Sequence, residues 1–208
     1  RLDLPLARGD EITVAVTYAG RLETAIPERE VLEMQDAQEV HQEIVIPPEK
    51  RTIYTNRSYW YPQSPIPTYA TATMRLTVPD GIGCVASGTP APGNPSRLDG
   101  GEARQLWSFS ATAPARYFAV VLTRLSPPVK DLVKLPPSAQ MDLAVIANPR
   151  QSGRARNFLE QANTILSTYA RIVGDLPYPS FNLALVDDQL PGGHSPAYFA
   201  VLHQPLPI

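Results

Sequence analysis

The order of apolar and polar positions along the chain predicts a succession of short β-strands in its first part. Residues 11–18 alternate, with Ile12, Val14, Val16 and Tyr18 on one face, which is the period of a half-buried antiparallel strand. Further strands are predicted at 43–46, 71–78, 82–86, 105–110 and 117–123. The last of these is almost wholly apolar, which is typical of a central strand. Short strands separated by turn signals favour an antiparallel β-sandwich or saddle.

In the last third of the chain, strand and helix signals alternate. Residues 141–147 have the pattern of a strand, and Ser152 can cap the helix that follows. The predicted apolar stripe of this helix consists of Phe158, Ala162, Ile165, Tyr169 and Ile172. Gly174 is placed to end the helix, and residues 181–186 form a second, almost wholly apolar strand. A strand, a helix and a strand in succession are typical of an α/β unit.

A proline-rich segment, residues 126–137, separates the two patterns. It contains two Pro-Pro pairs around a short charged stretch, a composition found both in domain boundaries and in ordinary long loops. We predict an antiparallel β domain over residues 1–137 and the beginning of an α/β domain over residues 138–208. The predicted fold class is therefore mostly β followed by α/β.

Composition and charge narrow the classes of function. The chain has 208 residues, of which 43% are hydrophobic and 18% charged, as in a folded globular protein. Its net charge of -2 provides no basic stripe for phosphates, so no nucleic-acid partner is predicted. No apolar run approaches the roughly 20 residues of a transmembrane helix. The lone Cys84 is expected to be a buried small apolar residue, and it leaves the cellular compartment undetermined.

The loop after the second apolar strand is the strongest candidate for function. Pro177 and Pro179 prevent the preceding helix from continuing, and the strand leads into Gly192-Gly193-His194-Ser195-Pro196. Two residues without a Cβ therefore lie just past a strand end. The backbone can approach a ligand closely at such a place.

Several stretches of the chain, taken in order, match a known pattern. They are the Tyr61–Pro67 turn, the strand at 70–79, Trp107–Phe109 with Ala115–Phe118, the Gly174–Pro179 turn and the 192–196 loop. The first resembles an F-P-x-x-D-x-P turn, with Pro65 at the position of the Asp, and the second resembles the strand that follows this turn. The third resembles a W-x-F and Y-x-x-A segment. The last two resemble a glycine with a Pro-aromatic-Pro turn and a G-x-M-E-N loop. All five belong to the gluzincin zinc aminopeptidases of the membrane alanyl aminopeptidase type.

The resemblance implies a fold and a function. It implies a saddle-like β domain followed by the first strand-helix-strand unit of a thermolysin-like catalytic domain, cut before the zinc motif. The chain would then be a fragment of a zinc metallopeptidase, with a peptide as substrate of the full-length protein. It would form the substrate-facing wall of the cleft, where Gly192, Gly193, His194 and Ser195 border the substrate. In the family this loop pairs with the extended substrate by strand addition.

The loop departs from the family at one decisive position. The family's Glu grips the free α-amine of the substrate, but Ser195 stands at that place and Pro196 replaces the Asn. A carboxylate-ammonium hydrogen bond contributes about 1.5–3 kcal/mol, against about 1 kcal/mol for a neutral one. Exo- or endopeptidase action is therefore left open. Asp187 or Asp188 is either a substitute anion or a solvated turn acid, and His194 either contacts a ligand or fixes its own turn.

The residues of the chain predict no catalytic residue and no metal site within it. The family's zinc is held by H-E-x-x-H on a helix and a distant Glu, and none of His41, His194 and His203 begins that motif. Zinc is therefore implied for the full-length protein by resemblance only, and the chain alone is expected to be inactive. Ser195 is not a hydrolase nucleophile, because Pro196 lacks the N–H that an oxyanion hole needs.

Two alternatives come from other classes of function. One is a relative that keeps the fold but acts as a binding or scaffolding module, and the other is a stand-alone β-sandwich binding module. The strand-helix-strand tail at 141–186 argues against the latter, because it needs further strands; its unfinished edge is expected to pair with another chain. The aromatic cluster Tyr59-Trp60-Tyr61 either lines a peptide groove or packs between the two parts of the chain.

Overall fold

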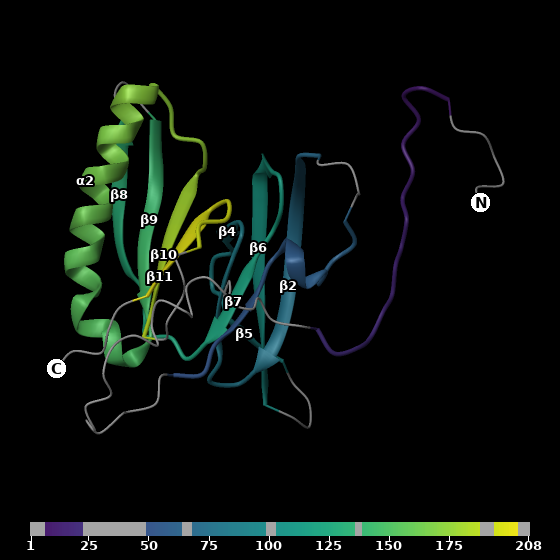
Figure 1. Ribbon diagram of the computed structural model, residues 1–208, viewed down its shortest axis with the longest axis horizontal. Coiled ribbons are helices and arrows are strands. Elements are labelled where there is room, and N and C mark those ends of the chain that lie inside the picture. Colours follow the sequence, from purple (N-terminus) through teal and green to yellow (C-terminus); the bar gives the residue numbers. More distant parts are fainter. Residues whose placement is uncertain are drawn as a thin grey trace, which may run out of the picture.

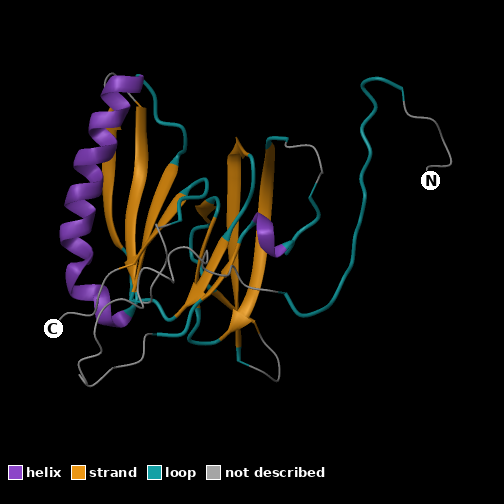
Figure 2. Cartoon of the chain, viewed as in Figure 1, coloured by secondary structure: helices purple, strands orange, loops and turns teal. Residues whose placement is uncertain are grey.

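The computed structural model shows a β-rich region followed by one short α/β unit, which confirms the predicted fold class (Figures 1 and 2). It describes residues 7–22, 49–63, 68–98, 103–135, 139–187 and 194–203. The predicted strand at 43–46 lies outside the described residues, as do Gly192, Gly193, His41 and Asp188.

The β-rich region forms two antiparallel sheets. The first sheet has the order β1-β7-β3 and consists of β1 (Thr52–Tyr54), β7 (Val120–Thr123) and β3 (Gly83–Ala86). The second sheet has the order β2-β6-β4, with β5 also paired to β6, and consists of β2 (Ala70–Pro79), β6 (Arg104–Ala115), β4 (Thr89–Pro90) and β5 (Ser96–Leu98). A 3-10 turn, η1 (Asn56–Ser58), follows β1. The apolar strand β7 lies in the centre of its sheet, as its sequence predicts.

The α/β unit is built on a third, mixed sheet with the order β11-β10-β9-β8. Its strands are β8 (Val129–Leu135), β9 (Ala139–Ala147), β10 (Ser180–Val186) and β11 (Phe199–His203). Strands β9, β10 and β11 run parallel, and β8 runs antiparallel to β9. A 3-10 helix, η2 (Pro149–Arg154), leads into α2 (Ala155–Val173), which lies along one face of the mixed sheet (Figure 1).

The mixed sheet is covered on both faces along the second half of β10. Leu183 and Leu185 pack with Leu159 of α2, whereas Ala184 and Val186 pack against the first sheet around Val121. Side chains of a strand point alternately to the two faces of its sheet. A strand buried on both faces therefore needs a continuous apolar run, which is the pattern that residues 183–186 show.

The alternating segment 11–18 is not a strand, which corrects the prediction. It has no partner strand among the described residues, and Figure 1 shows the purple N-terminal segment running apart from the strands. Ile12 is 51% exposed and Val14 68% exposed. Alternation alone does not form a strand, because a strand is stable only when it pairs with another and buries one face.

The predicted apolar stripe of the helix is wrong in part. Ala155, Leu159 and Ala170 are buried on α2, and Phe158, Ala162 and Leu166 pack partly against the same core. Ile165, Tyr169 and Ile172 are 53%, 63% and 75% exposed. Apolar residues lie on two neighbouring faces of α2, and only one of these faces packs against the mixed sheet.

The helix ends as predicted but begins differently. Gly174 has a φ of 84°, and its N–H donates to the carbonyl of Ala170 at 2.8 Å, so it is a left-handed C-cap. At the other end, Asn148 caps the 3-10 helix by accepting from the N–H of Gln151 at 3.1 Å. Ser152 lies inside this turn and does not cap α2.

The proline-rich segment 126–137 contains a strand rather than a linker alone. Val129–Leu135 form β8, which pairs with β9 from Val129↔Val145 to Leu135↔Ala139. Val133 is fully buried against the core beneath α2. The mixed sheet therefore begins before residue 138, while the division of the chain into domains at that point stays a prediction.

Candidate functional site

The structure places part of the predicted substrate loop at the edge of the mixed sheet. His194 forms an antiparallel bridge with Val201 of β11, the edge strand in the sheet order. The His194 N–H donates to the Val201 carbonyl at 3.3 Å, and the Val201 N–H donates to the His194 carbonyl at 2.7 Å. Backbone at His194 therefore extends the sheet by one position beyond β11.

Ser195 follows His194 at this edge of the sheet. Successive residues in an extended chain direct their backbone groups to opposite sides, and those of His194 are used on β11. Ser195 is exposed, and among the described residues its N–H and C=O make no hydrogen bond to β11. Pro196 has no N–H, so Ser195 provides the donor at this position. The arrangement can pair with an extended peptide.

The His194 side chain is half-buried and prefers the neutral state. Burial lowers its pKa below the ordinary value of 6.5. Its Nε2 atom is buried and has no hydrogen-bond partner in the described part of the chain. A neutral imidazole can accept a hydrogen bond and does not repel an ammonium group. Both roles considered for His194 remain predictions.

Tyr198 anchors the segment that follows the loop. Its backbone has a φ of 73°, which is uncommon for a residue other than glycine. The buried hydroxyl accepts from the N–H of Ala113 at 2.6 Å and donates to the Ala113 carbonyl at 3.2 Å. Its ring lies 4.4 Å from that of Tyr178, and its carbonyl accepts from the N–H of Asn182 at 2.9 Å. The loop is thereby attached to both β6 and β10.

Asp187 is neither a solvated turn acid nor a free anion for a substrate amine, which corrects both interpretations. Its side chain is 1% exposed and lies 3.4 Å from the Arg150 guanidinium. Its second oxygen accepts from the N–H of Glu49 at 3.1 Å. Because both carboxylate oxygens are engaged, Asp187 braces the end of β10 against the segment before β1.

The aromatic cluster before the second sheet packs instead of lining an open groove. Tyr61 contacts Phe118 edge-on at 5.7 Å, and its hydroxyl accepts from the Phe118 N–H at 3.1 Å. Trp60 donates its indole N–H to the Phe118 carbonyl at 3.3 Å. Both belong to a core that also contains Tyr178 and Tyr198. The packing role is thus confirmed for Trp60 and Tyr61, whereas Tyr59 is 75% exposed.

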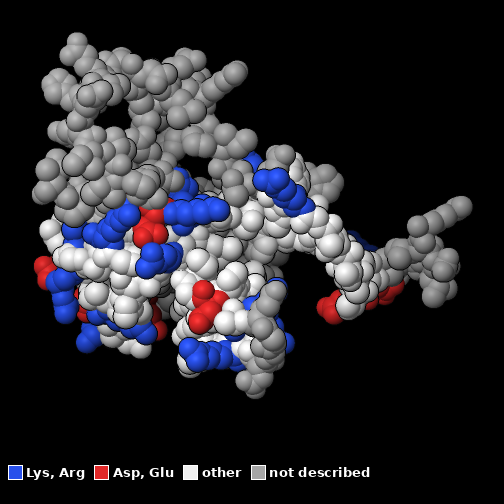
Figure 3. Space-filling model, turned by 90° about the horizontal axis from the view of Figure 1, so that it is seen from below, with Lys and Arg blue, Asp and Glu red and all other residues white. Residues whose placement is uncertain are grey.

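Three further observations concern Cys84, possible metal ligands and the length of the helices. Cys84 is 2% exposed, and burial raises the pKa of its thiol, as expected for a small apolar residue. Among the described residues, no group of three or more His, Cys, Asp or Glu could hold a metal ion. None of the described helices is long and apolar enough to span a bilayer. Basic and acidic side chains are interspersed on the face shown in Figure 3.

Sequence reasoning missed Asn182. It is the one polar residue among 181–186, and its side chain is buried, with 4% exposed. A single amide inside an otherwise apolar strand is a signal that could have been noticed, because a buried amide needs a hydrogen-bond partner. Asn182 lines a cavity to which the described residues of the predicted loop do not contribute.

Comparison with known proteins shows the fold. No protein-family model matches the chain, and no curated protein matches its sequence. Among solved structures, it is similar to the aminopeptidase A of Legionella pneumophila, solved in complex with aspartic acid, with a TM-score of 0.55 and 11% identity. The match covers 65% of this chain and 16% of that protein. About two thirds of the chain thus shares the fold of a small part of that aminopeptidase.

Proposed function

We propose that the chain is part of a zinc metallopeptidase resembling the membrane alanyl aminopeptidases, in which it forms the substrate-facing wall of the cleft. The observation that carries the proposal is the fold shared with a part of an aminopeptidase over 65% of the chain. The described residues do not fit a zinc site, because they contain no group of three ligands. Residues outside the described ones would therefore hold the zinc.

In this proposal the open edge at Ser195 binds the peptide main chain. An extended peptide adds to the sheet beyond His194, pairing with the N–H and C=O of Ser195. Gly192 and Gly193, which precede His194 in the sequence, would also border the substrate. The substrate amine meets a hydroxyl at Ser195 in place of a carboxylate, and Asp187 is engaged with Arg150. Discrimination in favour of free amino termini is therefore weak.

Peptide titration tests the edge directly. With tetra-alanine as the probe, we expect saturable shifts of the His194 and Ser195 amide signals in the ¹⁵N-labelled chain. Ser195→Pro removes the N–H donor, and we expect it to weaken binding about tenfold, the value of one hydrogen bond of about 1.4 kcal/mol. Ser195→Ala keeps the N–H and is the matched control, which should bind as the native chain does. Equal binding by all three chains would contradict the proposal.

A second candidate function is a binding module of the same fold without catalysis. The observation that favours it is the pair Ser195-Pro196, which removes the carboxylate and the amide that the resembled loop carries. The two functions differ in the full-length protein, where a peptidase contains stoichiometric zinc and hydrolyses alanine p-nitroanilide. The chain by itself is expected to be inactive; hydrolysis abolished by a substitution within it would show otherwise.

A further inference from the structure

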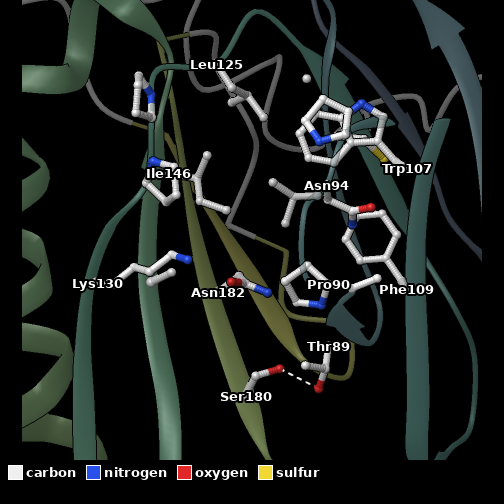
Figure 4. A pocket seen from close by; sticks show the side chains of 18 of the residues that line it. Thr89, Pro90, Asn94, Trp107, Phe109, Leu125, Lys130, Ile146, Ser180 and Asn182 are labelled. Carbon is white, nitrogen blue, oxygen red and sulfur yellow. Dashed lines mark hydrogen bonds between the residues drawn. The ribbon is translucent and has the colours of Figure 1, made fainter. Parts of the chain in front are cut away.

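A cavity of about 770 Å³ lies between the mixed sheet and the β-rich region, away from the loop at His194 (Figure 4). One wall comes from β8, β9 and β10, and the opposite wall from β4 and β6. The hydroxyls of Thr89 and Ser180 join the two walls at one end through a hydrogen bond of 2.8 Å. This volume is in the range of small-molecule sites in proteins, about 300–1,000 Å³.

The side chain of Asn182 points into this cavity without a partner. It is 4% exposed, and in the described part of the chain its amide makes no hydrogen bond (Figure 4). The other amides that line the cavity are engaged: Asn94 bonds the carbonyl and N–H of Ser108 at 2.6 and 3.0 Å, and Gln105 bonds Asp80. The Asn182 amide is accessible from the cavity and is not sealed in the core. Asn182 is therefore available to a ligand, whose amide would displace water from it.

The wall opposite Asn182 is flat and aromatic. Trp107 and Phe109 of β6 are stacked, with an interplanar angle of 8° and ring centroids 6.4 Å apart. Ile146 and Leu125 lie across the cavity from them (Figure 4). Aromatic rings on one wall and aliphatic side chains on the other give the cavity an apolar interior that suits an aromatic ring.

The charges around the cavity favour an uncharged ligand. Lys130 extends toward the cavity from β8 (Figure 4), and Asp142 of β9 lies on the same face of the sheet. Asp131 also lines the cavity, but its carboxylate accepts from the Leu132 N–H at 2.8 Å and from Asn163 at 2.6 Å. Asp131 keeps its charge but is bonded to Asn163 of α2, so one basic and one acidic side chain, Lys130 and Asp142, remain on the cavity face of the sheet and neither sign predominates there.

We propose that this cavity binds a planar, uncharged ring that carries an amide edge. Asn182 both donates to and accepts from the ligand amide, since a carboxamide has a carbonyl oxygen and an NH₂ group side by side. Trp107 and Phe109 face the ring on one side, and Ile146 faces it on the other. The site does not depend on the proposed peptidase function, and it involves none of the residues of the loop edge.

Benzamide is the probe, because it is a planar ring with an uncharged primary amide. In the ¹⁵N-labelled native chain we expect saturable shifts of Asn182, Thr89 and Phe109, with a dissociation constant of about 1 mM, as suits a small ligand. Acetophenone replaces the amide nitrogen by a methyl group, so we expect it to bind at least about fivefold more weakly. The proposal is overturned by equal binding of the two probes, or by no saturable shift of these signals up to about 20 mM benzamide.

A pair of variants locates the amide contact. Asn182→Leu removes both hydrogen-bonding groups, and we expect it to weaken benzamide binding about tenfold. Asn157→Leu, at an exposed position of α2 where the native side chain bonds only Gln161, is the control and should leave binding unchanged. Unchanged binding in Asn182→Leu would contradict the proposal. If that variant fails to fold, the comparison of benzamide with acetophenone on the native chain decides.

Discussion

The two ends of β10 hold polar groups in opposite ways. At the carboxyl end, Asp187 is sealed from solvent, with both carboxylate oxygens bound to Arg150 and to the backbone of Glu49. In the first half, Asn182 is 4% exposed, but its amide faces a cavity and is accessible from it. A buried carboxylate with its partners contributes to stability, whereas an amide that lines a cavity can bond water or a ligand. Burial alone thus does not distinguish a structural residue from a binding residue.

The largest effect on stability is expected from removing the carboxylate of Asp187. Asp187→Ala takes the acceptor away from the Glu49 N–H and breaks the ion pair with Arg150 in a buried place. We expect the free energy of unfolding to fall by about 2–4 kcal/mol, measured by urea denaturation. Asp187→Asn keeps an oxygen for the Glu49 N–H and should lose less. A loss below about 0.5 kcal/mol for Asp187→Ala, as at an ordinary surface position, would show that Asp187 does not stabilise the end of β10 and so does not differ from Asn182 in this respect.

A smaller loss is expected at Tyr198. Tyr198→Phe leaves the N–H and the carbonyl of Ala113 without their hydroxyl partner. The free energy of unfolding should fall by about 1–3 kcal/mol. Tyr169 is 63% exposed on α2, so Tyr169→Phe is the control and should change stability by less than about 0.5 kcal/mol. Equal effects of the two substitutions would show that the hydroxyl of Tyr198 does not anchor the segment after the loop.

The opposite sign is expected at Asn182. Leu has nearly the shape of Asn, and Asn182→Leu removes a buried amide that has no partner within the described chain. We expect the free energy of unfolding to stay level or to rise by about 1 kcal/mol. A loss of about 2 kcal/mol in the same urea experiment would show that the amide is structural, and the two ends of β10 would then be alike.

The smallest effect concerns pH and His194. Burial lowers the pKa of His194 in the folded chain, so the unfolded chain binds the proton at a pH where the folded chain does not. Stability is therefore fully present above the ordinary pKa of about 6.5 and falls as the pH drops below it, until the folded chain also binds the proton. The slope for one proton is at most about 1.4 kcal/mol per pH unit. In His194→Asn this part of the slope should vanish from urea unfolding curves recorded across that range.

The sequence predicts the elements whose pattern is decided locally. The alternation of β2 and the glycine at 174 are both found where expected, because side-chain alternation and a positive φ depend on a few neighbouring residues. The face of α2 and the strand β8 were not predicted correctly. Both depend on which surface of the mixed sheet meets them, and residues distant in the sequence determine that surface.

For the candidate site, too, the sequence indicates individual residues but not the partners that they contact. The resemblance places His194 and Ser195 in a loop that borders the substrate, which stays a prediction, and it could not show that Asp187 is engaged by Arg150 and Glu49. Nor could it show the cavity at Asn182, whose opposite wall comes from Trp107 and Phe109, more than 70 residues earlier in the chain. Polar residues acquire a role from their partners, and strand pairing determines the partners.

One titration tests the contrast between the two regions most directly. Tetra-alanine and benzamide are added in turn to the same ¹⁵N-labelled chain, and the amide shifts are mapped for both. We predict that the peptide shifts His194 and Ser195 and leaves Asn182 and Thr89 unchanged, and that benzamide does the reverse. Shifts of one common set of residues by both probes, or no saturable shift by either, would contradict the account.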